Sequence, residues 1–145
     1  MNIIYHVLSP SDCPSILPLL DEAAGCFPNL SAQSLSDAVR SNTTRGSAVA
    51  AFGGASAAGI VTYSMILNKI SFLYVSPGYR RRGIARELVE YALTALPGRE
   101  VTVETFTASD PRDAAARALY QSIGFTAAGE LNGYSTPMER FVLRR

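Results

Sequence analysis

The stretch that decides how this chain is organised is Val75-Ser76-Pro77-Gly78-Tyr79-Arg80-Arg81-Arg82-Gly83-Ile84-Ala85. A strand-like run over residues 70–75 leads into it, and an amphipathic helical pattern follows it. A basic loop between a strand and a helix suits a phosphorylated ligand, because the free N–H groups of the first helical turn and the helix dipole attract anions. Gly83 lets the backbone approach such a ligand without a Cβ in the way. The stretch therefore predicts a binding loop for a small anionic group.

Length and composition indicate one globular domain over residues 1–145. The chain has 145 residues, of which 48% are hydrophobic and 17% are charged, enough to bury a core. Its formal net charge of +1 gives no general reason to expect nucleic acid or an acidic membrane as a partner. No apolar run is long enough for a signal peptide or a membrane span. We therefore expect a soluble cytoplasmic protein.

The cysteines and the single histidine give no sign of a metal site. Cys13 and Cys26 lack the C-x-x-C spacing of metal ligands. A disulfide between them is compatible with the sequence, but we expect reduced, mostly buried thiols, since a chain of this size needs no such link. His6 falls on the first predicted strand and is expected to be structural, so we expect no metal.

Hydrophobic periodicity and turn residues predict the element order β-α-α-β-β-β-α-β-α-β-β. The strands are predicted at residues 3–8, 47–52, 58–67, 70–75, 101–106, 125–130 and 138–143. Helices are predicted at residues 14–24 and 31–40, from residue 84 to the Pro-Gly pair at 97–98, and from the Asp-Pro pair at 110–111 to residue 124. Consecutive strands in the middle with helices on the flanks predict an α+β fold, or a mixed α/β fold, built on one sheet.

Two helical stripes follow the basic loop. The first comprises Ile84, Leu88, Tyr91, Ala92 and Ala95, and the second Ala116, Leu119, Tyr120 and Ile123. Gly124 is a natural C-terminal cap for the second helix. Pro18 is awkward within the first predicted helix and predicts a late start or a kink there.

Two short motifs stand in order along this pattern. Arg80-Arg81-Arg82-Gly83-Ile84-Ala85 follows a strand of the type Leu73-x-Val75-x-Pro77, and Ala116-x-x-Leu119-Tyr120-x-x-x-Gly124-Phe125 comes later. They resemble the pyrophosphate motif Q/R-x-x-G-x-G/A and the Tyr-x-x-x-Gly-Phe segment of the GNAT superfamily of acyl-CoA-dependent N-acetyltransferases. Each motif alone is weakly specific. Both together, within a matching element order that covers essentially the whole chain, make the resemblance strong.

The resemblance implies a mostly antiparallel sheet that is splayed between its fourth and fifth strands, with helices on both faces. It also implies acetyl-CoA as co-substrate, without a metal. The two phosphates of coenzyme A would be held by backbone N–H groups of Arg80, Arg81, Arg82, Gly83, Ile84 and Ala85. The arginine side chains would reach the ribose 3′-phosphate or stay at the rim. The alternative for this loop is a solvated basic turn.

The end of the fourth strand would hold the pantetheine arm, by the same resemblance. A bulge there would leave backbone groups of Leu73, Tyr74 and Val75 free to pair with the pantetheine amides like an added strand. The N–H near Leu73 would also stabilise the oxyanion of the tetrahedral intermediate. The alternative is an ordinary buried strand.

Asp113 departs from the family pattern, in which many relatives have an asparagine that contacts the pantetheine arm. An ionised aspartate can accept a hydrogen bond from a pantetheine amide but cannot donate one. The alternative is that Asp113 caps its own helix and complements the helix dipole.

Tyr120 and Glu104 are the candidate acid and base. In the family, the tyrosine of Tyr-x-x-x-Gly-Phe protonates the leaving thiolate, and the alternative for Tyr120 is a core aromatic. Glu104 lies on the strand beside the predicted acyl site and could take the proton of the amine, directly or through water. The alternative is that it faces solvent and has no role. Ser71 and Tyr74 are weaker candidates for substrate contacts.

The sequence thus predicts acetyl transfer from acetyl-CoA to an amine by direct attack on the thioester. No covalent acyl-enzyme is expected, because neither cysteine is expected in the site. The acceptor, a small-molecule or peptide amine, would be lined by the first two helices, the loop at 27–29 and the hairpin at 132–137. We expect no nucleic-acid or membrane partner, and either a monomer or a homodimer.

Two other classes of function stay open at this point. One is a non-catalytic acyl-CoA sensor or interaction module with the same fold. The other is a domain whose basic loop binds a nucleotide or nucleic acid, against which the low net charge and the lack of a P-loop motif both count.

Overall fold

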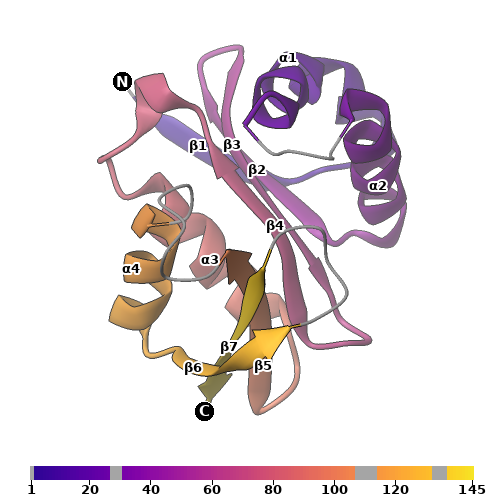
Figure 1. Ribbon diagram of the computed structural model, residues 1–145. Helices are drawn as coiled ribbons and strands as arrows, with labels where there is room; N and C mark the ends of the chain where they lie inside the picture. The colour runs from indigo at the N-terminus through magenta and orange to yellow at the C-terminus, as the bar shows by residue number, and fades with distance from the viewer. Residues whose placement is uncertain (1, 27–30, 107–113, 132–136) are drawn as a thin grey trace.

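The computed structural model describes residues 2–26, 31–106, 114–131 and 137–145, which are arranged on one seven-stranded sheet (Figure 1). Its helices are α1 (Cys13–Ala24), α2 (Ala32–Arg45), α3 (Ile84–Ala95) and α4 (Ala114–Ile123), with short 3-10 turns at Pro10–Asp12 and Pro77–Tyr79. Its strands are β1 (Ile3–Val7), β2 (Ala48–Gly53), β3 (Ser56–Ser64), β4 (Lys69–Val75), β5 (Glu100–Phe106), β6 (Thr126–Leu131) and β7 (Met138–Arg144). This order of helices and strands confirms the prediction.

The strands lie in the order β1-β2-β3-β4-β5-β7-β6. All neighbours pair antiparallel except β4 and β5, which are parallel. Helices α1 and α2 cover one face of the sheet and α3 and α4 the other (Figure 1). The mixed, mostly antiparallel sheet with helices on both faces is therefore confirmed.

The β4–β5 junction is splayed, as the resemblance implied. Registered pairing between the two strands is confined to Lys69 with Thr102 and Ile70 with Val103. On its other edge β4 continues to pair with β3, but the register shifts between Ile70 and Phe72. Ser71 is the extra residue of this β-bulge. The bulge lies at the start of the segment that diverges from β5.

The bulge also changes which side chains face which layer. Side chains normally alternate between the faces of a strand, so residues two apart share a face. Across Ser71 this alternation slips by one: Ile70, Leu73 and Val75 pack in the cluster with α3 and α4, whereas Phe72 and Tyr74 pack in the cluster with α1 and α2. The end of β4 thus presents Leu73 and Val75 to one helical layer and Tyr74 to the other.

Several predicted boundaries and burial assignments were wrong. Helix α2 runs five residues beyond 40, to Arg45, and ends at Gly46 in the left-handed conformation with φ +70°, which favours glycine. Strand β3 ends at Ser64, so the apolar residues Met65, Ile66 and Leu67 lie exposed in a turn. An apolar run of this kind is typical of a strand, but these three side chains are exposed. Asn68 then turns the chain, with φ +49°.

Helix burial also differs in places. Helix α1 begins at Cys13 and continues through Pro18, so the late start did not occur. In α3, Val89 is buried in place of the predicted Tyr91 and Ala95, which are exposed. Tyr91 still contributes packing, because its ring stacks on Tyr5 at a centroid distance of 5.4 Å.

The core beneath α3 gives a direct test of the packing. Leu88 is fully buried and Leu67 is 67% exposed. We expect Leu88→Ala to lower the free energy of unfolding by about 2–5 kcal/mol through lost burial and a residual cavity. Leu67→Ala removes the same atoms and should change it by less than about 0.5 kcal/mol. Urea unfolding measures both; equal effects would contradict the assigned core.

Candidate functional site

The loop between β4 and α3 holds its arginines against the protein. Arg80 donates from Nε to the Val75 carbonyl at 3.0 Å, and its guanidinium lies 5.8 Å from the centre of the Tyr74 ring. Arg82 lies 5.5 Å from the centre of the Tyr79 ring. Guanidinium groups that stack on aromatic rings gain a cation–π attraction. The loop is therefore an ordered cationic surface.

Two residues of this loop have a left-handed backbone conformation. Arg81 has φ +64° and Gly83, the N-cap of α3, has φ +78°. Left-handed residues within such a turn bring successive N–H groups to one side, which forms an anion-binding concavity. Gly83 has no side chain to cap the helix, and a Cβ added there would meet no protein atom within 4 Å. The backbone conformation thus favours glycine here, beside open space.

A cavity of about 710 Å³ lies against this loop, a size typical of small-molecule and cofactor sites. Its walls come from the end of β4, the loop, the first turn of α3, one side of α4 and the end of α1. The lining residues are Cys26, Leu73, Tyr74, Val75, Tyr79, Arg80, Arg81, Gly83, Ile84, Ala85, Arg86, Ala115, Ala116 and Leu119.

Most sequence-predicted binding residues line this one cavity. They are Leu73, Tyr74, Val75, Arg80, Arg81, Gly83, Ile84 and Ala85. Arg82, Tyr120 and Glu104 are not among the lining residues. Asp113 lies outside the described residues, so its contact with a cofactor stays a prediction.

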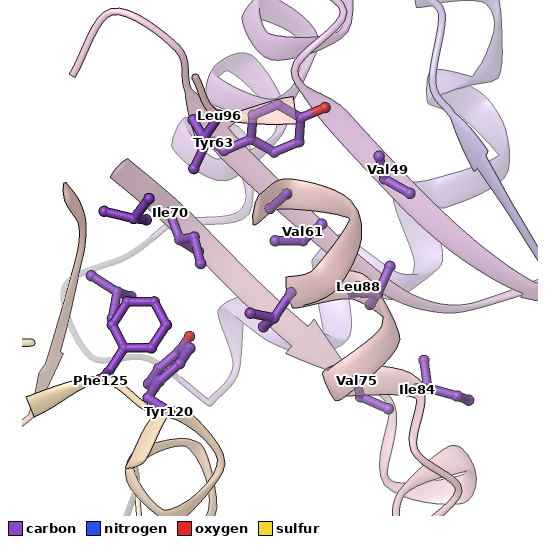
Figure 2. Packing of buried hydrophobic residues seen from close by; sticks show 14 of the residues in the cluster. Val49, Val61, Tyr63, Ile70, Val75, Ile84, Leu88, Leu96, Tyr120 and Phe125 are labelled. Carbon is purple, nitrogen blue, oxygen red and sulfur yellow. The ribbon is translucent and has the colours of Figure 1, made fainter. Parts of the chain in front are cut away.

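Tyr120 lies in the core behind the cavity wall. It is 3% exposed, and its ring packs on Phe125 at a centroid distance of 5.5 Å (Figure 2). The Tyr120 carbonyl accepts hydrogen bonds from the N–H groups of Gly124 and Phe125. Gly124, at φ +121°, makes that helix end feasible. The Tyr-x-x-x-Gly-Phe motif therefore has a structural basis, and the proton-donor role of Tyr120 stays a prediction.

Helix α4 is fixed to its neighbours by charged side chains. Arg117 pairs with Glu139 of β7 at 2.5 Å, and its guanidinium lies 4.8 Å from the centre of the Phe141 ring. Arg86 of α3 donates to the Ser122 hydroxyl at 2.5 Å. These contacts set the α4 wall of the cavity relative to α3 and β7.

Glu104 belongs to an ion-pair group on the sheet. Its Oε1 lies 3.2 Å from Lys69 Nζ and 4.0 Å from Arg140 Nη2. The carboxylate is mostly buried, with 17% of its side chain exposed. Its role as a base stays a prediction.

The sequence analysis missed a cluster on the α1 side of the cavity. Tyr74 donates from its hydroxyl to Glu22 Oε1 at 2.8 Å, and Cys26 Sγ lies 3.8 Å from the same hydroxyl. Burial raises the pKa of Tyr74 well above its usual value, and the hydrogen bond to Glu22 raises that pKa further. Tyr74 thus stays protonated near neutral pH and donates to the carboxylate. Periodicity could not show this contact, because Glu22 and Tyr74 are distant in sequence.

The expectation for the cysteines was partly wrong. Both thiols are free, as expected, and Cys13 is buried, but Cys26 is exposed. Cys26 also lines the cavity, whereas the sequence analysis placed both cysteines outside the site. Cys26 lies just after the end of α1, and its place beside Tyr74 of β4 depends on tertiary packing.

Two searches of the described residues found nothing. No group of three or more His, Cys, Asp or Glu side chains within them could hold a metal ion. None of the helices described here is both long and apolar enough to span a membrane.

Comparison with known proteins identifies the family. A model of the acetyltransferase (GNAT) family matches residues 16–125, which is more than half of the chain. The chain belongs to the acetyltransferase (GNAT) family. The resemblance drawn from the two motifs is thereby confirmed. No curated protein matches the chain closely enough to count as a relative.

Solved structures show the same acetyltransferase fold. A GNAT-family acetyltransferase from Bacillus cereus superposes with a TM-score of 0.82 at 20% identity, covering 100% of this chain and 99% of the other. The PaiA N-acetyltransferase from Thermoplasma acidophilum, in complex with coenzyme A, gives 0.73 at 16% identity, with full coverage of both chains. The yncA protein of Salmonella typhimurium, with its cofactor acetyl-CoA, gives 0.72 at 13% identity, covering 98% and 93%.

The two cysteines of this GNAT-family chain provide an internal probe of the cavity. We expect N-ethylmaleimide to modify exposed Cys26 quickly and Cys13, which is 6% exposed, slowly. Acetyl-CoA added first should slow the reaction at Cys26, because a ligand in the cavity would cover that thiol. Peptide mass spectrometry measures both rates, and Cys26→Ser is the control. An unchanged Cys26 rate at saturating acetyl-CoA would show that the ligand leaves this end of the cavity open.

Proposed function

We propose that this protein transfers the acetyl group of acetyl-CoA to an amine. The observation that carries the proposal is the cavity between the splayed end of β4 and the N-terminus of α3. One end supplies the anion-binding turn at Arg81 and Gly83, suited to a diphosphate. The other end supplies a strand edge, suited to an extended chain that carries amides. Coenzyme A has both parts, joined in that order.

The pantetheine arm would lie along Leu73–Val75. In the described structure, β5 pairs with β4 only at Lys69 and Ile70, so the backbone edge beyond them is open to an added strand. Ala115, Ala116 and Leu119 form the facing wall, and the two alanines leave room for the arm. The thioester carbonyl would then accept a hydrogen bond from the Leu73 N–H, which would stabilise the developing oxyanion.

The reaction would be direct attack of the amine nitrogen on the thioester carbon. The N–C bond forms, the C–S bond breaks, and the thiolate of coenzyme A takes a proton from Tyr120. The attacking amine loses a proton, and Glu104 is the candidate base. Because neither Glu104 nor Tyr120 lines the cavity, both proton transfers would run through water. Holding both reactants together in one complex supplies much of the acceleration.

Ligand-induced stabilisation tests the cofactor assignment. A ligand at about 100 times its dissociation constant stabilises a protein by about 2.7 kcal/mol, which should raise Tm by several degrees. We expect acetyl-CoA and coenzyme A to raise Tm, and ATP and NAD at equal concentration to raise it less. An equal response to ATP would favour a nucleotide-binding protein.

Two glycine variants separate backbone strain from ligand contact. Gly83 and Gly54 both have positive φ, +78° and +64°, and a Cβ at either meets no protein atom within 4 Å. Each substitution by alanine should therefore cost about 1–2 kcal/mol of stability. Only Gly83→Ala should also weaken acetyl-CoA binding, by roughly tenfold or more, because its Cβ would enter the phosphate site. Calorimetric titration measures the affinity of each variant for acetyl-CoA. Equal affinities of the two variants would contradict phosphate binding at this loop.

The proton-donor role has its own test. Tyr120→Phe should lower kcat over an amine panel by roughly 10²–10⁴-fold while changing acetyl-CoA affinity little. Tyr63→Phe is the matched control, because Tyr63 is equally buried, at 3% exposed, and has no role in the proposed proton transfers. Release of the coenzyme A thiol measures turnover. Full activity of Tyr120→Phe would show that Tyr120 is not the acid. Acetyl-CoA binding without thiol release in the unaltered protein would favour an acyl-CoA sensor.

A further inference from the structure

The cavity is unevenly charged. Its loop side carries Arg80, Arg81 and Arg86, and no carboxylate is among the residues that line it in the described chain. An ammonium group would be repelled from that side. One carboxylate, Glu22, is joined to the cavity wall through its hydrogen bond with Tyr74.

Glu22 is positioned by several contacts at the end of α1. Glu22 and Cys26 are four residues apart, and Cys26 Sγ lies 3.7 Å from the Glu22 carbonyl. Tyr74, which is 5% exposed, donates to Glu22 Oε1, so Oε2 lies outside that bond. The Glu22 residue itself is exposed. Tyr74, which lines the cavity, thus holds an accessible carboxylate at its hydroxyl.

The Tyr74 ring separates the two charges. The Arg80 guanidinium lies over its ring, and the Glu22 carboxylate lies at its hydroxyl. The arginine side suits the phosphates of the cofactor, and the Glu22 side suits a cation. The cofactor would therefore lie near the face of this ring, and a cationic group of the acceptor would lie near its hydroxyl.

Glu22 is badly placed to hold the nitrogen that reacts. That nitrogen must reach the thioester at the β4 backbone near Leu73, whereas Glu22 meets β4 at the tip of the Tyr74 side chain. The reacting nitrogen must also be neutral, and an adjacent carboxylate would favour its charged form. A carboxylate at this distance can instead hold a different positive group without opposing the attack.

We propose that Glu22, held by Tyr74, binds a second cationic group of the acceptor, so that the substrate is a diamine or polyamine rather than a monoamine. This inference rests on the proposed acetyl transfer. In this proposal Glu22 determines substrate specificity and takes no part in the proton transfers.

Putrescine and butylamine test the inference, because they have the same carbon chain and differ by one amino group. We expect a lower KM for putrescine in the unaltered protein. Glu22→Gln should raise that KM by roughly tenfold to a hundredfold, the range for losing a charge-assisted hydrogen bond. The KM for butylamine and for acetyl-CoA should stay unchanged, since the glutamine oxygen can still accept from Tyr74.

Asp21→Asn is the matched control. It removes the same charge from the neighbouring exposed position, so it reports any general field effect and should leave the putrescine KM unchanged. Calorimetric titration of putrescine into the coenzyme A-loaded protein gives a second readout that needs no turnover. Glu22→Gln should weaken this binding and Asp21→Asn should not.

Three outcomes would overturn the inference: equal KM values for the two amines, equal effects of the two variants, or no putrescine binding to the loaded protein. Failure of the acetyl transfer itself would differ, because no amine, butylamine included, would then release thiol from acetyl-CoA, whether or not acetyl-CoA raised Tm. The two failures are therefore distinguishable.

Discussion

The site depends on β4 being paired on both edges only at its beginning. After Ile70, β5 leaves the ladder, and the bulge at Ser71 shifts the remaining residues by one position. An open strand edge within a sheet would ordinarily leave backbone polar groups without partners. Here that edge borders a cavity that ends at a helix N-terminus. A single irregularity of the sheet thus produces both the cleft and the orientation of its walls.

The same shift gives Tyr74 its place. Without the extra residue at Ser71, Tyr74 and Ile70 would share a face, and the tyrosine would point into the α3–α4 layer. The bulge instead turns Tyr74 toward α1, where it meets Glu22. The ring thereby lies between the arginine loop and the α1 carboxylate. The placement of Glu22 and Arg80 on one tyrosine follows from strand register rather than from net charge, which is close to zero.

The fold and the loop side of the site could be predicted because local signals determine them. The turn at 77–78, the glycine at 83 and the helical stripes act over a few residues, and the structure brings their predicted binding residues to one cavity. The α1 side could not be predicted, because Glu22 and Cys26 reach Tyr74 only through tertiary packing. Exposure of residues 65–67 was missed for a related reason: an apolar run shows no difference between a buried strand and an uncovered turn.

Tyr120 shows how one residue can serve the fold and the proposed chemistry together. Its ring packs in the core against Phe125, and its carbonyl accepts the two N–H groups that end α4. A proton donor must be held in a fixed position, and a side chain already ordered by packing loses little further entropy when it meets the thiolate. Burial behind the cavity wall is therefore compatible with the acid role. The Arg117–Glu139 pair and the Arg86–Ser122 bond fix the helix that carries Tyr120, so the position of Tyr120 depends on contacts that hold α4 against β7 and α3.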